Sequence, residues 1–362
     1  MKNILALITV LAVALGFATA CDFIDNISEL IKEPALIGVS MPNQTTARWM
    51  KDGETMEEIL VGRGYEVDLR YAGDSIPAQI RQIEEMLDNG AKVLVIAAID
   101  GAALSDVLDK AAEDGAFIIA YDRLIMGTTA VSYYATFDNV KVGELQATSL
   151  VSAMKATKDR RQYSIELFAG SPDDSNAPFL FSGAMSVLQP LIDSGEVRVF
   201  SGQTALEDVR TPRWDIATAE ARMDAILAEF YRDGKPLDGV LAPNDNIARG
   251  VIAAFHTFGF HPGADNWPIV TGQDAEAASI KLIITGEQHS TILKDTRDLA
   301  RVAADMVEAV LEGREPVIND ATTYDNNVKV VPTYLLVPYT VHADNYKQLI
   351  IDSGYMTEDD IE

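Results

Sequence analysis

Short apolar runs alternate with amphipathic segments over the first third of the chain. Continuous apolar runs, typical of strands buried on both faces of a sheet, occupy residues 36–41, 93–98 and 117–121, and residues 65–71 alternate as a further strand. Apolar residues recur at helical spacing over residues 46–62, 76–89 and 102–112. Strands and helices alternate in this way when parallel strands are covered by helices on both faces. The pattern therefore predicts a doubly wound α/β unit.

The same order of elements begins again in the second half of the chain. Strands are expected over residues 163–168, 197–201, 239–242 and 269–272, and helices over residues 177–194, 215–231, 246–258 and 275–285. Two similar units in tandem predict two doubly wound parallel-sheet domains that face each other. The fold class is α/β, with two lobes.

The first 21 residues have the character of an export signal. Lys2 provides a positive end, residues 4–17 are almost wholly apolar, and small residues 18–20 precede Cys21. This arrangement resembles a bacterial lipobox, in which the Cys is acylated, although Ala18 stands where Leu is usual. Cleavage beside an unmodified Cys is the alternative. Cys21 is the single cysteine, so no intramolecular disulfide can form, and residues 22–34 read as a linker.

The composition excludes several partners. The 362 residues carry a formal net charge of −26, and no run of Lys and Arg forms the basic stripe that nucleic acid requires. Strong acidity favours a soluble monomer. The four His show no metal-ligand spacing, and we expect no cofactor.

Polar side chains follow nearly every predicted strand. In open parallel sheets the ligand binds outside the carboxyl ends of the strands. The residues found there include Asn43, Arg48, Trp49, Asp100, Asp122, Arg123, Asp173, Asp174, Asn176, Asn244, Asp245, Gln273 and Asp274. Carboxylates accept from sugar hydroxyls, while Arg and Asn donate to them, and an aromatic ring packs on the C–H face of a pyranose. The set predicts a sugar site.

Each residue also has a structural alternative. Asp or Asn after a strand often caps the next helix. Trp214 fits a core position, and Asp173 and Asp174 fit a solvated loop. Six strands followed by the same chemistry are more informative than any one of them.

At these residues the chain resembles a known family, the type I periplasmic sugar-binding proteins of ABC importers. Within it the chain is most similar to the ChvE-like multiple-sugar-binding group and the D-xylose-binding proteins. The similarity extends over nearly all of the mature chain. The matching segments are residues 47–49, 93–106, 120–125, 131–146, 165–177, 213–215, 272–276, 286–288 and 294–297.

The resemblance implies two lobes that close on one aldose. The resemblance implies ten ligand residues. Four of them belong to the first lobe: Arg48, Trp49, Asp122 and Arg123. Four belong to the second lobe, namely Asn176, Trp214, Asp245 and Asp274, while Asn139 lies at the first crossing between the lobes and Lys294 at the second. Trp49 and Asp100 have packing and capping as alternative roles. The residue before Asp245 varies across such proteins, which leaves its contact open.

The family's chain crosses between the lobes three times. We expect crossings near Asp138, near Lys294 and near residues 325–327. The first lobe then comprises residues 35–138 and 294–325, and the second comprises residues 139–293 and 326–362.

These features predict an extracytoplasmic lipoprotein, in the periplasm or on the cell surface. It would deliver glucose, galactose or xylose to an ABC permease and would not be an enzyme. Docking on a chemoreceptor or sensor kinase is an alternative that nothing in the sequence excludes. A sugar-processing enzyme could use Asp122 and Asp274 as paired carboxylates. A sugar-sensing transcription factor would need an N-terminal helix-turn-helix where the apolar segment lies.

Overall fold

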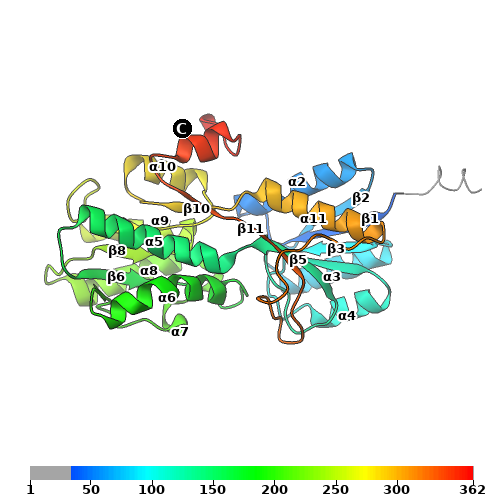
Figure 1. The fold of residues 1–362 in the computed structure, drawn as a ribbon, viewed down its shortest axis with the longest axis horizontal. Helices are drawn as coiled ribbons and strands as arrows, with labels where there is room; N and C mark the ends of the chain where they lie inside the picture. The colour runs from blue at the N-terminus through cyan, green and yellow to red at the C-terminus, as the bar shows by residue number, and fades with distance from the viewer. Residues whose placement is uncertain (1–33, 362) are drawn as a thin grey trace, which may run out of the picture.

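The computed structural model describes residues 34–361. The predicted signal segment, Cys21 and all of the predicted linker except its last residue lie outside this range. Two lobes lie side by side in Figure 1, joined by strands that pass between them near the centre of the view. Among the described residues, no helix combines the length and apolar character needed to cross a bilayer.

The first lobe contains a six-stranded sheet in which all pairs are parallel. Its order is β11-β5-β4-β3-β1-β2, with strands β1 (Leu36–Met41), β2 (Glu66–Tyr71), β3 (Val93–Ile96), β4 (Phe117–Tyr121), β5 (Val131–Phe137) and β11 (Thr333–Leu336). Alternate strand residues feed two cores. One core joins the sheet to α2 (Ala47–Gly62) and α11 (Thr296–Leu311), and the other joins it to α3 (Ile76–Asp88) and α4 (Ser105–Glu113).

The second lobe is built on a four-stranded parallel sheet of order β7-β6-β8-β9. The strands are β6 (Tyr163–Leu167), β7 (Val197–Arg198), β8 (Gly239–Leu241) and β9 (Ile269–Val270). Its two main cores hold α5 (Asn139–Thr157) with α6 (Ala177–Asp193), and α8 (Ile216–Ile226) with η2 (Leu227–Tyr231) and α9 (Asp245–Phe258). The predicted α/β class, with two doubly wound lobes, is confirmed.

Shorter elements complete the second lobe. They are α7 (Leu206–Val209), η1 (Pro212–Trp214), α10 (Ala277–Thr285), η3 (Lys347–Asp352) and η4 (Asp359–Ile361). An antiparallel pair, β10 (Thr291–Leu293) and β12 (Tyr339–Val341), lies beside them.

The chain passes between the lobes between β5 and α5, between β10 and α11, and between β11 and β12. The third crossing was predicted near residues 325–327, and this is wrong. The chain stays in the first lobe because Tyr324 and Val331 are fully buried in its core and β11 pairs with β5. The side-chain amide of Asn326 also donates to the carbonyls of Ile125 and Thr128. The return to the second lobe comes after Leu336.

Candidate functional site

The guanidinium group of Arg48 lies where the two lobes meet. Arg48 lies in the first turn of α2, the helix that follows β1. Its Nη2 donates to Asp122 Oδ1 at 2.9 Å, and its Nε donates to Asp52 Oδ2 at 3.2 Å. Its Nη1 lies 3.6 Å from Asp274 Oδ1, which belongs to the second lobe. One cation therefore faces carboxylates of both lobes.

Lys294 supplies a second cation, from the crossing that follows β10. Its Nζ lies 3.4 Å from Asp274 Oδ1 and 3.7 Å from Asp122 Oδ1, and the residue is 5% exposed. Asp274 Oδ1 is buried and accepts no hydrogen bond within residues 34–361. These charges attract one another, but their longer separations leave the Asp274 carboxylate able to accept a hydrogen bond from a ligand hydroxyl.

The backbone holds Asp122 and Asp274 in left-handed conformations, with φ of 59° and 94°. Such φ values are uncommon for residues with a side chain and concentrate at ligand sites. The Asp122 carbonyl accepts from Tyr134 Oη at 2.6 Å, from Thr136 Oγ1 at 2.9 Å and, across the lobes, from Asn176 Nδ2 at 2.8 Å. Three donors thus fix the strand end that carries the Asp122 carboxylate.

Electrostatics keep Asp122 ionised. Burial alone would raise the pKa of Asp122, but Arg48, Lys294 and Arg123 outweigh burial and lower it to about 2. At neutral pH its carboxylate is therefore a hydrogen-bond acceptor only.

A second junction between the lobes lies beside Arg123. Arg123 Nε is 3.1 Å from Asp174 Oδ2, and Asp174 also accepts from Trp214 Nε1 at 3.2 Å. The Trp214 ring packs directly against Gly170. A side chain at position 170 would overlap the ring, so the loop requires glycine at this position. Asp174 is 5% exposed, so its alternative role as a solvated loop charge is wrong, whereas Asp173 is exposed.

Asp52 and Tyr121 lie behind Arg48, and neither was predicted as a site residue. The Tyr121 hydroxyl donates to Asp52 Oδ1 in the first lobe's core. The i,i+4 spacing of Arg48 and Asp52 on a helix is the sequence signal that could have found this pair. Their role is to orient the guanidinium.

Asp245 does not join the charged cluster. Its Oδ1 accepts from Gln288 Nε2 at 2.9 Å and Thr291 Oγ1 at 2.8 Å, and its Oδ2 accepts from the Glu276 backbone N–H at 2.9 Å. Both oxygens are thus bonded inside the second lobe, where Asp245 positions the loop that carries Asp274.

The other predicted residues divide between the site and its supports. Asn176 faces Asp122 and Tyr134 across the lobes. Asn139 is buried at the first crossing, where its backbone N–H donates to the Tyr324 hydroxyl. The Trp49 ring packs beneath Arg48, whose Cζ lies 4.4 Å from the ring centroid. Asp100 accepts from the Ala102 N–H in a local turn and does not cap α4, whose N-cap residue is Leu104.

Two buried carboxyl groups make folding depend on pH. Burial and the charge of Glu276 raise the pKa of Asp245 to about 8, and burial raises the pKa of Asp52 to about 6 although Arg48 and Tyr121 lower it. Unfolded Asp has a pKa of about 4, so the folded state binds more protons between pH 8 and about pH 4. The contribution of these two groups to the free energy of unfolding therefore rises as pH falls through this window. Asp122 acts oppositely, because its stabilisation is lost as pH falls toward 2.

We expect the free energy of unfolding of the natural chain, measured by urea denaturation relative to that of an Asp245→Asn variant, to increase from pH 8 to pH 5. The variant has no proton to take up at this position, whereas the other titrating groups, including His289, contribute equally to both profiles. Equal slopes for the two proteins would contradict proton uptake at Asp245.

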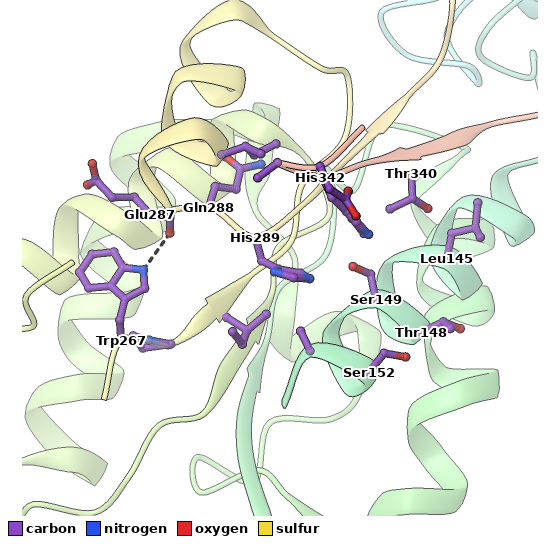
Figure 2. A pocket seen from close by; sticks show the side chains of 17 residues that line it. Leu145, Thr148, Ser149, Ser152, Trp267, Glu287, Gln288, His289, Thr340 and His342 are labelled. Carbon is purple, nitrogen blue, oxygen red and sulfur yellow. Dashed lines mark hydrogen bonds between the residues drawn. The ribbon is translucent and has the colours of Figure 1, made fainter. Parts of the chain in front are cut away.

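A separate groove of about 630 Å³ lies on the second lobe. Figure 2 shows Thr148, Ser149 and Ser152 of α5 facing His289 and His342 across it, with Trp267 on the far side. Burial and His342 lower the pKa of His289 to about 4, so this imidazole is neutral at pH 7. The groove contains none of the ten predicted ligand residues. Among the described residues, no group of three His, Cys, Asp or Glu is arranged to hold a metal ion.

Two doubly wound lobes with charged residues opposed between them define the class of two-lobed binding proteins. The profile of the periplasmic binding protein domain matches residues 37–315, so the chain belongs to this family.

Comparisons with individual proteins agree with this assignment. The chain is 48% identical over 361 residues to the multiple sugar-binding periplasmic receptor ChvE of Rhizobium radiobacter, covering 100% of both chains. It is 34% identical over 325 residues to the D-xylose-binding periplasmic protein of Escherichia coli K12, covering 90% of this chain and 92% of that protein. The resemblance expected from the sequence is confirmed.

Among solved structures, an ABC transporter solute binding protein from Clostridium phytofermentans with bound beta-D-glucose superposes with a TM-score of 0.86. The two chains are 47% identical, and the match covers 90% of this chain and 100% of that one.

Proposed function

We propose that this protein is an extracytoplasmic solute-binding protein that captures a monosaccharide between its lobes and passes it to an ABC permease. The observation that carries the proposal is the opposition of Asp122 of the first lobe and Asp274 of the second across Arg48 and Lys294. Carboxylates accept from sugar hydroxyls and the two cations donate to them, so one aldose can bond to both lobes.

The names of the relatives support this ligand class. ChvE is named as a multiple sugar-binding receptor, and the matched Clostridium protein holds beta-D-glucose. We infer that D-glucose is a ligand, with D-galactose and D-xylose as further candidates. The relatives named as periplasmic also support export, and Cys21 is our proposed lipid attachment site.

Closure of the lobes is the proposed means of capture. An open form would expose both sets of polar residues to water. A sugar that bonds to both sets at once binds the closed form more tightly and shifts the population toward it.

The test is a thermal-shift panel with D-glucose, D-galactose, D-xylose, L-arabinose and D-ribose. Both lobes' cores lie within residues 34–361, so a variant lacking residues 1–21 retains them. A ligand at a hundredfold its dissociation constant adds about 2.7 kcal/mol, or roughly 5 °C or more in the melting temperature. We expect such a shift with at least D-glucose. No shift with any of the five sugars, from a sample that melts cooperatively, would contradict the proposal.

A further inference from the structure

Residues 342–361 pack on the second lobe. After β12, η3 and η4 lie over α10, where Ile350 is fully buried against Ile280 and Ile283. Figure 1 shows this red segment directly above α10. Tyr355, between η3 and η4, is 5% exposed and belongs to the same apolar cluster. This anchoring means that the segment moves with the second lobe.

The same segment contacts two cations of the first lobe. Lys51 of α2 donates from Nζ to the Tyr355 carbonyl at 2.5 Å, and Nζ lies 3.9 Å from the centroid of the Tyr355 ring. Arg297, in the first turn of α11, donates from Nη1 to the Ser353 carbonyl at 3.1 Å. Because α2 and α11 pack together on the first lobe's sheet, these contacts run from one lobe to the other.

The contact is adjacent to the charged cluster. Lys51 directly precedes Asp52 and lies three residues after Arg48 on the same helix. Burial is the main cause that raises the pKa of the Tyr355 hydroxyl, and the negative charge of Asp52 is the second. Burial lowers the pKa of Lys51. Tyr355 is enclosed between the two lobes, since it is 5% exposed and contacts both Lys51 of the first lobe and the apolar cluster of the second.

We propose that residues 342–361 form an interlobe clasp, in which Lys51 and Tyr355 hold the closed form and set how slowly bound sugar leaves. This inference rests on the proposed function. Opening the lobes separates Lys51 from Tyr355 and returns both groups to water, so the clasp stabilises the closed form alone. Contacts made after encounter act on the dissociation rate and leave the association rate nearly unchanged.

The direct test compares Lys51→Met with Lys281→Met. Methionine keeps the aliphatic stem and the helix propensity of Lys51 but removes its ammonium group. Lys281 is exposed on α10, beside the clasp but on one lobe only. Stopped-flow fluorescence measures D-glucose dissociation. We expect Lys51→Met to raise the dissociation rate about 3- to 30-fold, the effect of losing a charge-assisted hydrogen bond and a cation–π contact. Lys281→Met should match the natural chain, and equal rates for both variants would overturn the clasp.

A second measurement detects the contact itself, with D-glucose present so that the closed form is populated. A Lys51→Cys/Tyr355→Cys double variant lacking residues 1–21 carries no other cysteine. A short bismaleimide should join its two thiols within one chain, and each single variant provides the control. Failure to join two reactive thiols would overturn the clasp. Crosslinking in a protein that binds none of the five sugars would instead preserve the clasp and refute the proposed function.

Discussion

An Asp122→Asn variant should bind D-glucose at least about a hundredfold more weakly than the natural chain. Asparagine keeps the shape of the side chain and tolerates the φ of 59° at this position. It removes the charge that faces Arg48 and Lys294 and replaces one acceptor oxygen with a donor. Loss of two charge-assisted hydrogen bonds, worth about 1.5–3 kcal/mol each, gives at least this factor. Isothermal titration calorimetry measures it.

The control for this variant is Asp100→Asn. Asp100 follows a neighbouring strand of the same lobe, but its carboxylate bonds locally to the Ala102 N–H. We expect its affinity for glucose to equal that of the natural chain. Equal affinities for the Asp122→Asn variant and the natural chain would remove Asp122 from the site.

Replacement of Arg48 by Met should have the largest effect on stability. The Arg48 side chain is 8% exposed and faces Asp52, Asp122 and Asp274. Its removal leaves three carboxylates close together without their shared cation, and breaking a buried pair in this way costs about 3–5 kcal/mol. We expect a lower melting temperature at pH 7 and loss of glucose binding.

The pH profile separates this cause from a simple loss of packing. Arg48 lowers the pKa of both Asp52 and Asp122, so both pKa values rise without it, and burial holds that of Asp52 further above its unfolded value. The folded variant then binds more protons than the unfolded chain, so its stability recovers as pH falls from 7 to 5. Arg301→Met, which removes an exposed ion pair with Asp298, should change stability by less than about 1 kcal/mol. An equal deficit for Arg48→Met at pH 7 and pH 5 would indicate lost packing instead of unpaired charge.

The periodicity of apolar residues was sufficient for most of the fold. Strands such as β3 and β4 are continuous apolar runs, and their burial on both faces explains why the pattern is unambiguous. By contrast, β11 was missed. It is four residues long and lies at the edge of the sheet, and three of its residues are only partly buried, so its pattern is weak. Its pairing with β5 joins residues about 200 positions apart, which no local pattern records.

The candidate site likewise contains residues that a local sequence pattern predicts and contacts between residues far apart in sequence that it does not. Asp122 and Asp274 follow strands, and the rule for open parallel sheets places them correctly at the strand ends. Asp245 also follows a strand, but its oxygens bond to Gln288, Thr291 and Glu276, which are far away in sequence. The contact of Lys51 with Tyr355 spans 304 positions and depends wholly on how the lobes meet.

The most direct test of sugar binding between the lobes is a crystal structure of the protein grown with D-glucose. We expect one pyranose between the lobes, within hydrogen-bonding distance of Asp122 and Arg48 on one side and of Asp274 and Lys294 on the other. An interlobe space that holds no sugar, or a sugar bound in the groove between α5 and His289 instead, would contradict it.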